Sequence, residues 1–368
     1  LLLAGAGSGK TTVLIHRVEN ILRFGHGADT RELPPGADEK MLLVLEDAAA
    51  GRTSMTDDIR RMCAVDPAAP WQVLAITFTN KAADELKSRL EAKLGETGRD
   101  VWALTFHGTC VRILRRDADR LGFPKSFTIY DQADSLSVMK RILRDKNIDD
   151  KVFPPKAMLA AASRYKGALV APEDAVAAEE RTGDIRCIRT AQICAAYAKH
   201  LRDAGAMDFD DLIYYTVRLL QDNPDVLAYY QKKFRYVLID EYQDTNHLQY
   251  LFAALMASGS RNICVVGDDD QSIYKFRGAT IENILSFEKQ YPDARVIRLE
   301  QNYRSTGNIL AAANAVIANN HERKGKTLWT AQSGGEPITL YEAHNEDDEA
   351  DFVARTIRST RRPMRDFA

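Results

Sequence analysis

A glycine-rich turn near the start of the chain has the composition of a phosphate-binding loop. Residues 4 to 12 read Ala-Gly-Ala-Gly-Ser-Gly-Lys-Thr-Thr and follow a short apolar run. In such a turn the backbone N–H groups can point at phosphate oxygens, and the N-terminus of the following helix adds positive potential. Lys10 would reach the β- and γ-phosphates of a nucleotide, and the Thr11 hydroxyl would hold Mg²⁺. The residues expected to bind the nucleotide here are Ala4, Gly5, Ala6, Gly7, Ser8, Gly9, Lys10, Thr11 and Thr12.

The spacing of this turn excludes a second kind of glycine-rich loop. A dinucleotide-binding turn of the GxGxxG type starting at Gly5 would need glycine at position 10, where the chain has Lys10. The strict P-loop pattern has glycine where Ala4 stands, but alanine still permits a tight turn. The sequence therefore predicts a nucleoside triphosphate site.

Two neighbouring carboxylates follow another apolar run. The run is Tyr236–Ile239, and Asp240 and Glu241 come directly after it. In P-loop enzymes the first acidic residue of such a pair binds Mg²⁺, and the second can act as general base toward the attacking water. Adjacent buried carboxylates are costly unless a cation compensates them. We therefore expect Asp240 and Thr11 to be the metal-binding residues and Glu241 to be catalytic.

The elements that must position these groups alternate between strands and helices. Five short runs are apolar on both faces, as parallel strands covered on both sides must be. Between them lie amphipathic patterns, such as the helical stripe formed by Ala83, Leu86, Leu90 and Leu94. This alternation predicts an α/β fold with a parallel, doubly wound sheet. The predicted strands are Leu1–Ala4, Val73–Phe78, Tyr236–Ile239, Ile263–Val266 and Val296–Leu299.

Two regions interrupt this rhythm. Residues 28–70 contain several prolines around a middle that could form short helices, which predicts a surface insertion without chemistry. From about Asp117 to Ala206 the strand patterns disappear and helical patterns dominate, one of them behind a possible Asp131 cap. A helical block inserted into an α/β domain usually adds a surface that faces the substrate.

The composition sets outer limits on the class of protein. The chain has 368 residues and a net charge of −2, which neither favours nor excludes a nucleic-acid partner. Because no apolar run approaches the roughly 18 residues of a membrane span, we expect no membrane partner. The five cysteines form no CxxC pair and suit a reducing cytoplasm. The chain begins at Leu1 and runs directly into the glycine-rich turn, as expected for a piece of a longer protein.

Taken in order, six segments resemble motifs I, Ia, Ib, II, III and IV of the superfamily 1 DNA helicases of the UvrD/PcrA/Rep type. The resemblance covers nearly the whole chain except the insertion, and Asp208-Phe-Asp-Asp-Leu also resembles a stretch that precedes motif II in that family. The six segments are Ala4–Thr12, Ala75–Ala83, Thr105–Gly108, Asp240–Asp244, Gly267–Ala279 and Leu299–Thr306.

This resemblance implies roles around the nucleotide. Gln271 would sense the γ-phosphate and the attacking water, since an amide can donate to one and accept from the other. Arg304 would place a guanidinium on the γ-phosphate from a second domain, and Tyr303 would stack on the adenine. The catalytic set implied is Lys10, Glu241, Gln271 and Arg304, with ATP and Mg²⁺ as cofactors.

The resemblance also implies a track for single-stranded DNA. Aromatic faces suit such a track because every base has a π-face, so stacking does not read the sequence. The family commonly has tryptophan where this chain has Phe276, which stacks over a smaller area. Thr79 and Lys81 would contact phosphates, which positions the strand without specifying it. The implied DNA-binding residues are Phe78, Thr79, Lys81, His107, Tyr274, Phe276 and Arg277.

By this resemblance the chain is the N-terminal portion of an ATP-dependent helicase that moves 3′ to 5′ on single-stranded DNA and acts at duplex/single-strand junctions in repair or replication. Its fold would be a RecA-like P-loop domain with a helical inserted subdomain and the start of a second RecA-like domain. Two alternatives stay open: the motor of a helicase–nuclease, and an inactive fragment that binds DNA. The implied division is residues 1–117 with 207–292 as the first motor domain, 118–206 as the helical subdomain, and 293–368 as the incomplete second motor domain.

Overall fold

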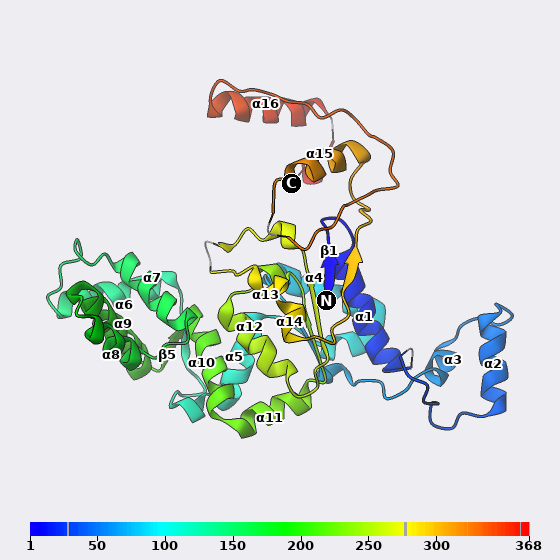
Figure 1. The fold of residues 1–368 in the computed structure, drawn as a ribbon, viewed down its shortest axis with the longest axis horizontal. Coiled ribbons are helices and arrows are strands. Elements are labelled where there is room, and N and C mark those ends of the chain that lie inside the picture. The colour runs from blue at the N-terminus through cyan, green and yellow to red at the C-terminus, as the bar shows by residue number, and fades with distance from the viewer. Residues whose placement is uncertain (28, 276–277, 322, 361, 368) are drawn as a thin grey trace.

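The computed structural model describes residues 1–368 except 28, 276–277, 322, 361 and 368. At its centre lies a six-stranded sheet with the order β3-β2-β6-β7-β1-β8, in which every neighbouring pair is parallel. Figure 1 shows helices covering both sides of this sheet. The expected α/β fold with a parallel sheet is therefore confirmed. The strands are β1 (Leu2–Ala4), β2 (Val73–Thr77), β3 (Trp102–Thr105), β6 (Tyr236–Ile239), β7 (Ile263–Gly267) and β8 (Ile297–Leu299).

The two faces of the sheet bury two separate cores. Because side chains alternate along a strand, Leu74 and Ile76 of β2 pack into one core while Val73 and Ala75 pack into the other. This is why the sequence of the central strands is apolar without interruption. The helices of the sheet domain are α1 (Lys10–Phe24), α4 (Asn80–Leu94), α5 (Phe106–Asp117), α10 (Phe209–Asp222), α11 (Pro224–Lys233), α12 (His247–Ala257), α13 (Glu282–Leu285) and α14 (Phe287–Gln290).

The edge strands differ from the sequence-based expectation. We did not predict β3, because it has only four residues and buries only every second side chain. The run Val296–Leu299 was expected to be a buried strand that opens a second domain. In the structure β8 is an exposed edge strand of the first sheet, where it pairs with β1, and Ile297 is 41% exposed. The prediction that this run is buried on both faces was therefore wrong.

A helical block follows α5 and has a core of its own, which includes Met139, Ile193 and Tyr197. Asp131 caps its first helix, as expected, by accepting a hydrogen bond from the Asp134 backbone N–H at 2.8 Å. Two short parallel strands that we did not predict close the block where it meets the sheet domain. Its elements are β4 (Thr128–Tyr130), α6 (Gln132–Asp145), α7 (Pro155–Gly167), α8 (Pro172–Thr182), α9 (Ile185–Asp203) and β5 (Ala206–Asp208).

A buried ion cluster ties this block to the sheet domain. The Lys166 ammonium of α7 lies 2.7 Å from Asp208 Oδ2 and 2.8 Å from Asp211 Oδ1, at the start of α10. The Tyr197 hydroxyl donates to the same Asp208 oxygen at 3.0 Å. Burial raises the pKa of Asp211 to about 7, although Lys166 opposes this rise. The two buried carboxylates therefore share one counter-charge, the Lys166 ammonium group.

We expect Lys166→Met to lower the free energy of unfolding by about 3–5 kcal/mol, because it leaves buried carboxylates without their counter-charge. Lys199→Met is the matched control, since Lys199 pairs with Asp203 on the exposed face of α9 and should lose less than about 1 kcal/mol. Urea denaturation of both variants measures the difference. Equal stability of the two variants would contradict a structural role for the Lys166 cluster.

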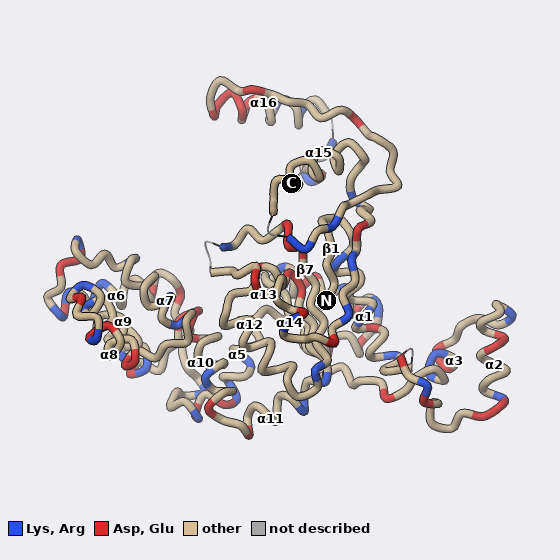
Figure 2. Tube along the Cα trace, viewed as in Figure 1, with Lys and Arg blue, Asp and Glu red and all other residues tan. Residues whose placement is uncertain are grey.

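The remaining helices project from the sheet domain in Figure 1, α2 and α3 at the right and α15 and α16 at the top. The predicted insertion contains two exposed helices, and the C-terminal segment contains two more. In Figure 2 the start of α16 is red because residues 346–349 are all acidic, which suits the positive end of a helix dipole. In the part of the chain that the structure describes, no helix combines the length and apolar character of a membrane span. These four helices are α2 (Glu39–Ala49), α3 (Asp57–Met62), α15 (Gly307–Ile317) and α16 (Glu346–Ser359).

Candidate functional site

The glycine-rich turn connects β1 to α1 at the carboxyl edge of the sheet, where open parallel sheets bind their ligands. Gly7 and Gly9 have φ angles of 70° and 83°, a region in which side chains are strained. Gly9 directly precedes the first helical residue, Lys10, and the Ser8 hydroxyl donates to the Gly5 carbonyl at 2.7 Å. The turn therefore presents the open N–H groups of a helix N-terminus, as an anion site requires.

The acidic pair after β6 faces this turn directly. Lys10 Nζ lies 3.0 Å from Glu241 Oε2, and the Thr11 hydroxyl donates to Asp240 Oδ2 at 3.3 Å. Glu241 has a φ of 51°, a left-handed conformation that is unusual for glutamate and is typical of functional sites when a fold enforces it. The structure thus brings together the four residues for which we predicted phosphate, metal and water chemistry.

The surroundings of Asp240 favour a bound cation. Burial, and next the adjacent Glu241, raise the pKa of Asp240 to about 6. A cation at this position would offset both effects. The Thr11 hydroxyl and the Asp240 carboxylate are oxygen donors of the type that Mg²⁺ prefers. These residues therefore fit the predicted metal ion.

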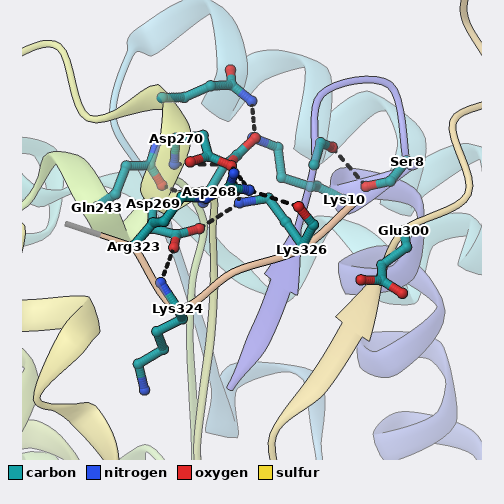
Figure 3. A network of polar contacts seen from close by, with 12 residues as sticks. Ser8, Lys10, Gln243, Asp268, Asp269, Asp270, Glu300, Arg323, Lys324 and Lys326 are labelled. Carbon is teal, nitrogen blue, oxygen red and sulfur yellow. Dashed lines mark hydrogen bonds and ion pairs between the residues drawn. The ribbon is translucent and has the colours of Figure 1, made fainter. Parts of the chain in front are cut away.

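One glutamine, Gln243, connects this acidic pair to the loop after β7, and a second, Gln271, is bonded within that loop. The Gln243 side chain donates from Nε2 to Glu241 Oε2 at 3.0 Å and accepts from the Asp268 backbone N–H at 2.9 Å. The Gln271 amide donates to Asp268 Oδ2. Figure 3 shows Gln243 and Asp268 in this network. A Cβ atom on Gly267 would lie 2.8 Å from Gln243 Oε1, so only glycine permits this approach. Sequence reasoning gave no role to Gln243 or Asp268, although both lie inside quoted motifs.

The segment after β8 packs onto the phosphate loop. The Asn302 side chain donates to the Ala6 carbonyl at 2.7 Å, and the Tyr303 backbone N–H donates to the Gly7 carbonyl at 3.0 Å. A Cβ atom on Gly7 would lie 2.8 Å from Arg304 Cβ. Arg304 and Tyr303 therefore lie beside the loop, as their predicted nucleotide roles need, and both side chains are exposed. Asn302, which fixes this contact, was missed.

Aromatic side chains form two pairs beyond the ends of the strands. The rings of Phe78 and Tyr274 stack with centroids 5.9 Å apart, and those of His107 and Phe209 meet edge to face at 5.7 Å. Phe209 was not assigned a role, but it is 53% exposed and lines a cavity of about 870 Å³ between α6, α7 and α10. The exposed ring of Phe209 and the half-buried rings of Phe78, His107 and Tyr274 suit base stacking.

Of the other predicted DNA contacts, the structure describes Thr79 and Lys81. Thr79 and Lys81 are exposed at the start of α4, where the Thr79 hydroxyl caps the helix by accepting from the Ala82 N–H at 3.1 Å. Both residues can therefore meet a phosphate from solvent. Phe276 and Arg277 lie outside the described residues.

Comparison with known proteins adds two family matches and a set of close relatives. Residues 33–292 match the UvrD/REP helicase N-terminal domain, and residues 297–368 match the UvrD-like helicase C-terminal domain. The chain is 46% identical over 368 residues to the ATP-dependent DNA helicase PcrA of Staphylococcus epidermidis. It is 48% identical over 362 residues to the protein of the same name from Staphylococcus aureus.

These alignments cover 100% and 98% of this chain, respectively, and 44% of each relative. The chain thus spans less than half the length of the curated relatives it matches. The N-terminal family model alone covers well over half of the chain. The chain therefore belongs to the UvrD/REP helicase family.

Proposed function

We propose that the full-length protein is an ATP-dependent DNA helicase that translocates 3′ to 5′ on single-stranded DNA and separates strands at duplex/single-strand junctions in repair or replication. The observation that carries this proposal is the meeting of Lys10, Thr11, Asp240 and Glu241 at one edge of the sheet. All five cysteines lie within the described part of the chain and are free, which fits action in a reducing cytoplasm.

The hydrolytic step follows from the positions of these side chains. Lys10 neutralises charge on the β- and γ-phosphates, and Glu241 accepts the proton of the attacking water. Gln243 and Lys10 both donate to Glu241 Oε2 and so hold that carboxylate in place. Mg²⁺, held by Thr11 and Asp240, would supply charge neutralisation of the phosphates. Arg304 would complete the site from the segment that packs onto the phosphate loop.

Movement along DNA requires contacts that differ between the ATP and ADP states, because a ligand shifts an equilibrium only by its differential affinity. The Phe78–Tyr274 pair suits this task because Phe78 directly follows β2 while Tyr274 follows the Gln271 loop. A movement of the loop that carries Gln271 would therefore shift Tyr274, and with it the aromatic pair that we propose stacks on a base.

We expect Phe78→Ala to weaken single-strand DNA binding by about 1–3 kcal/mol, largely independent of sequence, because one stacking surface is lost. Trp71→Ala is the control, since Trp71 is 55% exposed and precedes β2 at its opposite end. Fluorescence anisotropy with oligo-dT and with mixed sequences measures the effect. Wild-type affinity in a folded Phe78→Ala protein would remove Phe78 from the DNA track.

The proposed activity and its direction are tested by strand displacement with the full-length protein. The substrates are one duplex with a 3′ single-stranded tail and one with a 5′ tail, each with and without ATP. We expect ATP-dependent unwinding of the 3′-tailed duplex only. Preference for the 5′ tail would overturn the polarity, and degradation of the strands would instead favour a helicase–nuclease.

A further inference from the structure

Three consecutive carboxylates follow β7 and converge on one lysine that is distant in sequence. Lys326 Nζ lies 2.7 Å from Asp268 Oδ1 and 2.9 Å from Asp270 Oδ2, and it also contacts Asp269 (Figure 3). The side chains of Lys326, Asp268 and Asp269 are at most 3% exposed. Like charges so close together and so deeply buried require a counter-ion, and the Lys326 ammonium occupies that position.

The segment that carries Lys326 is fixed to the same site by further contacts. The Lys324 backbone N–H donates to Asp269 Oδ2 at 2.7 Å, and Arg323 lies 2.8 Å from Asp270 Oδ2. Two residues beyond Lys326, the Leu328 side chain packs on the phosphate loop so closely that a Cβ atom on Gly5 would lie 2.1 Å from its Cδ2. Residues 323–328 therefore contact both the phosphate loop and the loop that carries Gln271.

Asp268 connects Lys326 to the residues expected to act in hydrolysis. One Asp268 oxygen contacts Lys326 and the other accepts from the Gln271 amide. The Asp268 backbone N–H donates to Gln243, whose amide donates to Glu241. An unbroken chain of polar contacts thus runs from Lys326 to Glu241, with Gln271 attached to it.

We propose that Lys326 is a positioning residue for ATP hydrolysis, whose ammonium group gathers Asp268, Asp269 and Asp270 and so holds Gln271 and Gln243 in line with Glu241. The inference rests on the proposed ATPase function. Lys326 touches no group assigned to the nucleotide, so its effect is on geometry. Without the ammonium, the three carboxylates repel one another, so the Asp268 side chain leaves the Gln271 amide and the loop that carries the Asp268 backbone N–H shifts relative to Gln243.

The test is steady-state ATP hydrolysis by the full-length protein with saturating oligo-dT, beside binding of a fluorescent ADP analogue and thermal melting. We expect Lys326→Met to lower kcat by about 10²-fold, the scale at which a small misplacement acts, with ADP affinity unchanged. Lys326→Arg keeps the charge and should recover most of the lost kcat. Lys324→Met is the matched control: its ammonium pairs with Glu288, and its contact to Asp269 comes from the backbone, so kcat should stay at the wild-type value.

A second variant is needed if Lys326→Met lowers the melting temperature so far that the protein is unfolded in the assay. Lys326→Met with Asp269→Asn removes one positive and one negative charge, so the cluster keeps its net charge without the ammonium bridge. We expect this double variant to fold and to show the same loss of kcat. The proposal is overturned by wild-type kcat in the folded variant that lacks Lys326, or by a loss that falls equally on ADP affinity. The unsubstituted protein tests the ATPase function itself. If it shows no DNA-dependent hydrolysis, the proposed function fails, whereas wild-type kcat in a folded Lys326 variant overturns only the role of Lys326.

Discussion

Replacing Glu241 with glutamine is expected to lower kcat for ATP hydrolysis by about 10²–10⁴-fold, because an amide cannot accept the proton of the attacking water. Nucleotide binding should persist, since glutamine has the same shape and its side-chain oxygen can still accept from Lys10 and Gln243. Glu241 has a left-handed backbone, and we expect glutamine to keep it because the two side chains differ only at the terminal group. Steady-state ATPase assays and binding of a fluorescent ADP analogue measure the two quantities.

Glu85→Gln is the control for this experiment. Glu85 lies on the exposed face of α4, where it pairs with Arg89, so its loss should leave kcat unchanged. Appreciable steady-state turnover by Glu241→Gln would remove Glu241 from the role of general base. A loss of ADP binding in the same variant would show that the carboxylate charge holds the site together.

Lys10→Ala should also stop hydrolysis, with a loss of about 10²–10³-fold or more, because the phosphates lose their main neutralising side chain. Unlike Glu241→Gln, this variant should bind ATP more weakly, since Lys10 touches the nucleotide in the ground state as well as the transition state. It also leaves the partly buried Glu241 without the ammonium at 3.0 Å.

The matched control is Lys40→Ala, which removes an exposed lysine from α2 in the surface insertion. ATP affinity and kcat of both variants are measured in the full-length protein. Wild-type ATP affinity in Lys10→Ala would contradict the position that we give to the phosphates at the start of α1.

The parts of the site that depend on local sequence could be predicted. The turn from Gly5 to Gly9 and the pair Asp240–Glu241 each follow a buried strand, and strand ends in a parallel sheet share one edge. Their position at one edge of the sheet therefore follows from the strand pattern. The helix over residues 80–94 was predictable for the same reason, since its apolar stripe and its first turn lie within one segment.

The parts that depend on strand order and burial could not be predicted. Gln243 reaches Asp268 because β6 and β7 are neighbours, which no spacing in the sequence states. Lys166 and Lys326 are buried against carboxylates distant in sequence, whereas lysine is ordinarily a surface residue. Strand β3 was missed because a half-exposed strand has a weaker apolar pattern, and β8 was misjudged because its apolar residues lie at the exposed edge of the sheet.

The measurement that tests the motor account most directly is the ATPase rate of the purified full-length protein with and without single-stranded DNA. We expect Mg²⁺-dependent hydrolysis that rises steeply with oligo-dT and is about 10²–10⁴-fold slower in Glu241→Gln. We expect the same rise with mixed-sequence DNA, because stacking on aromatic side chains does not read bases. A rate that is the same with and without DNA, in protein that binds both ATP and DNA, would contradict the account.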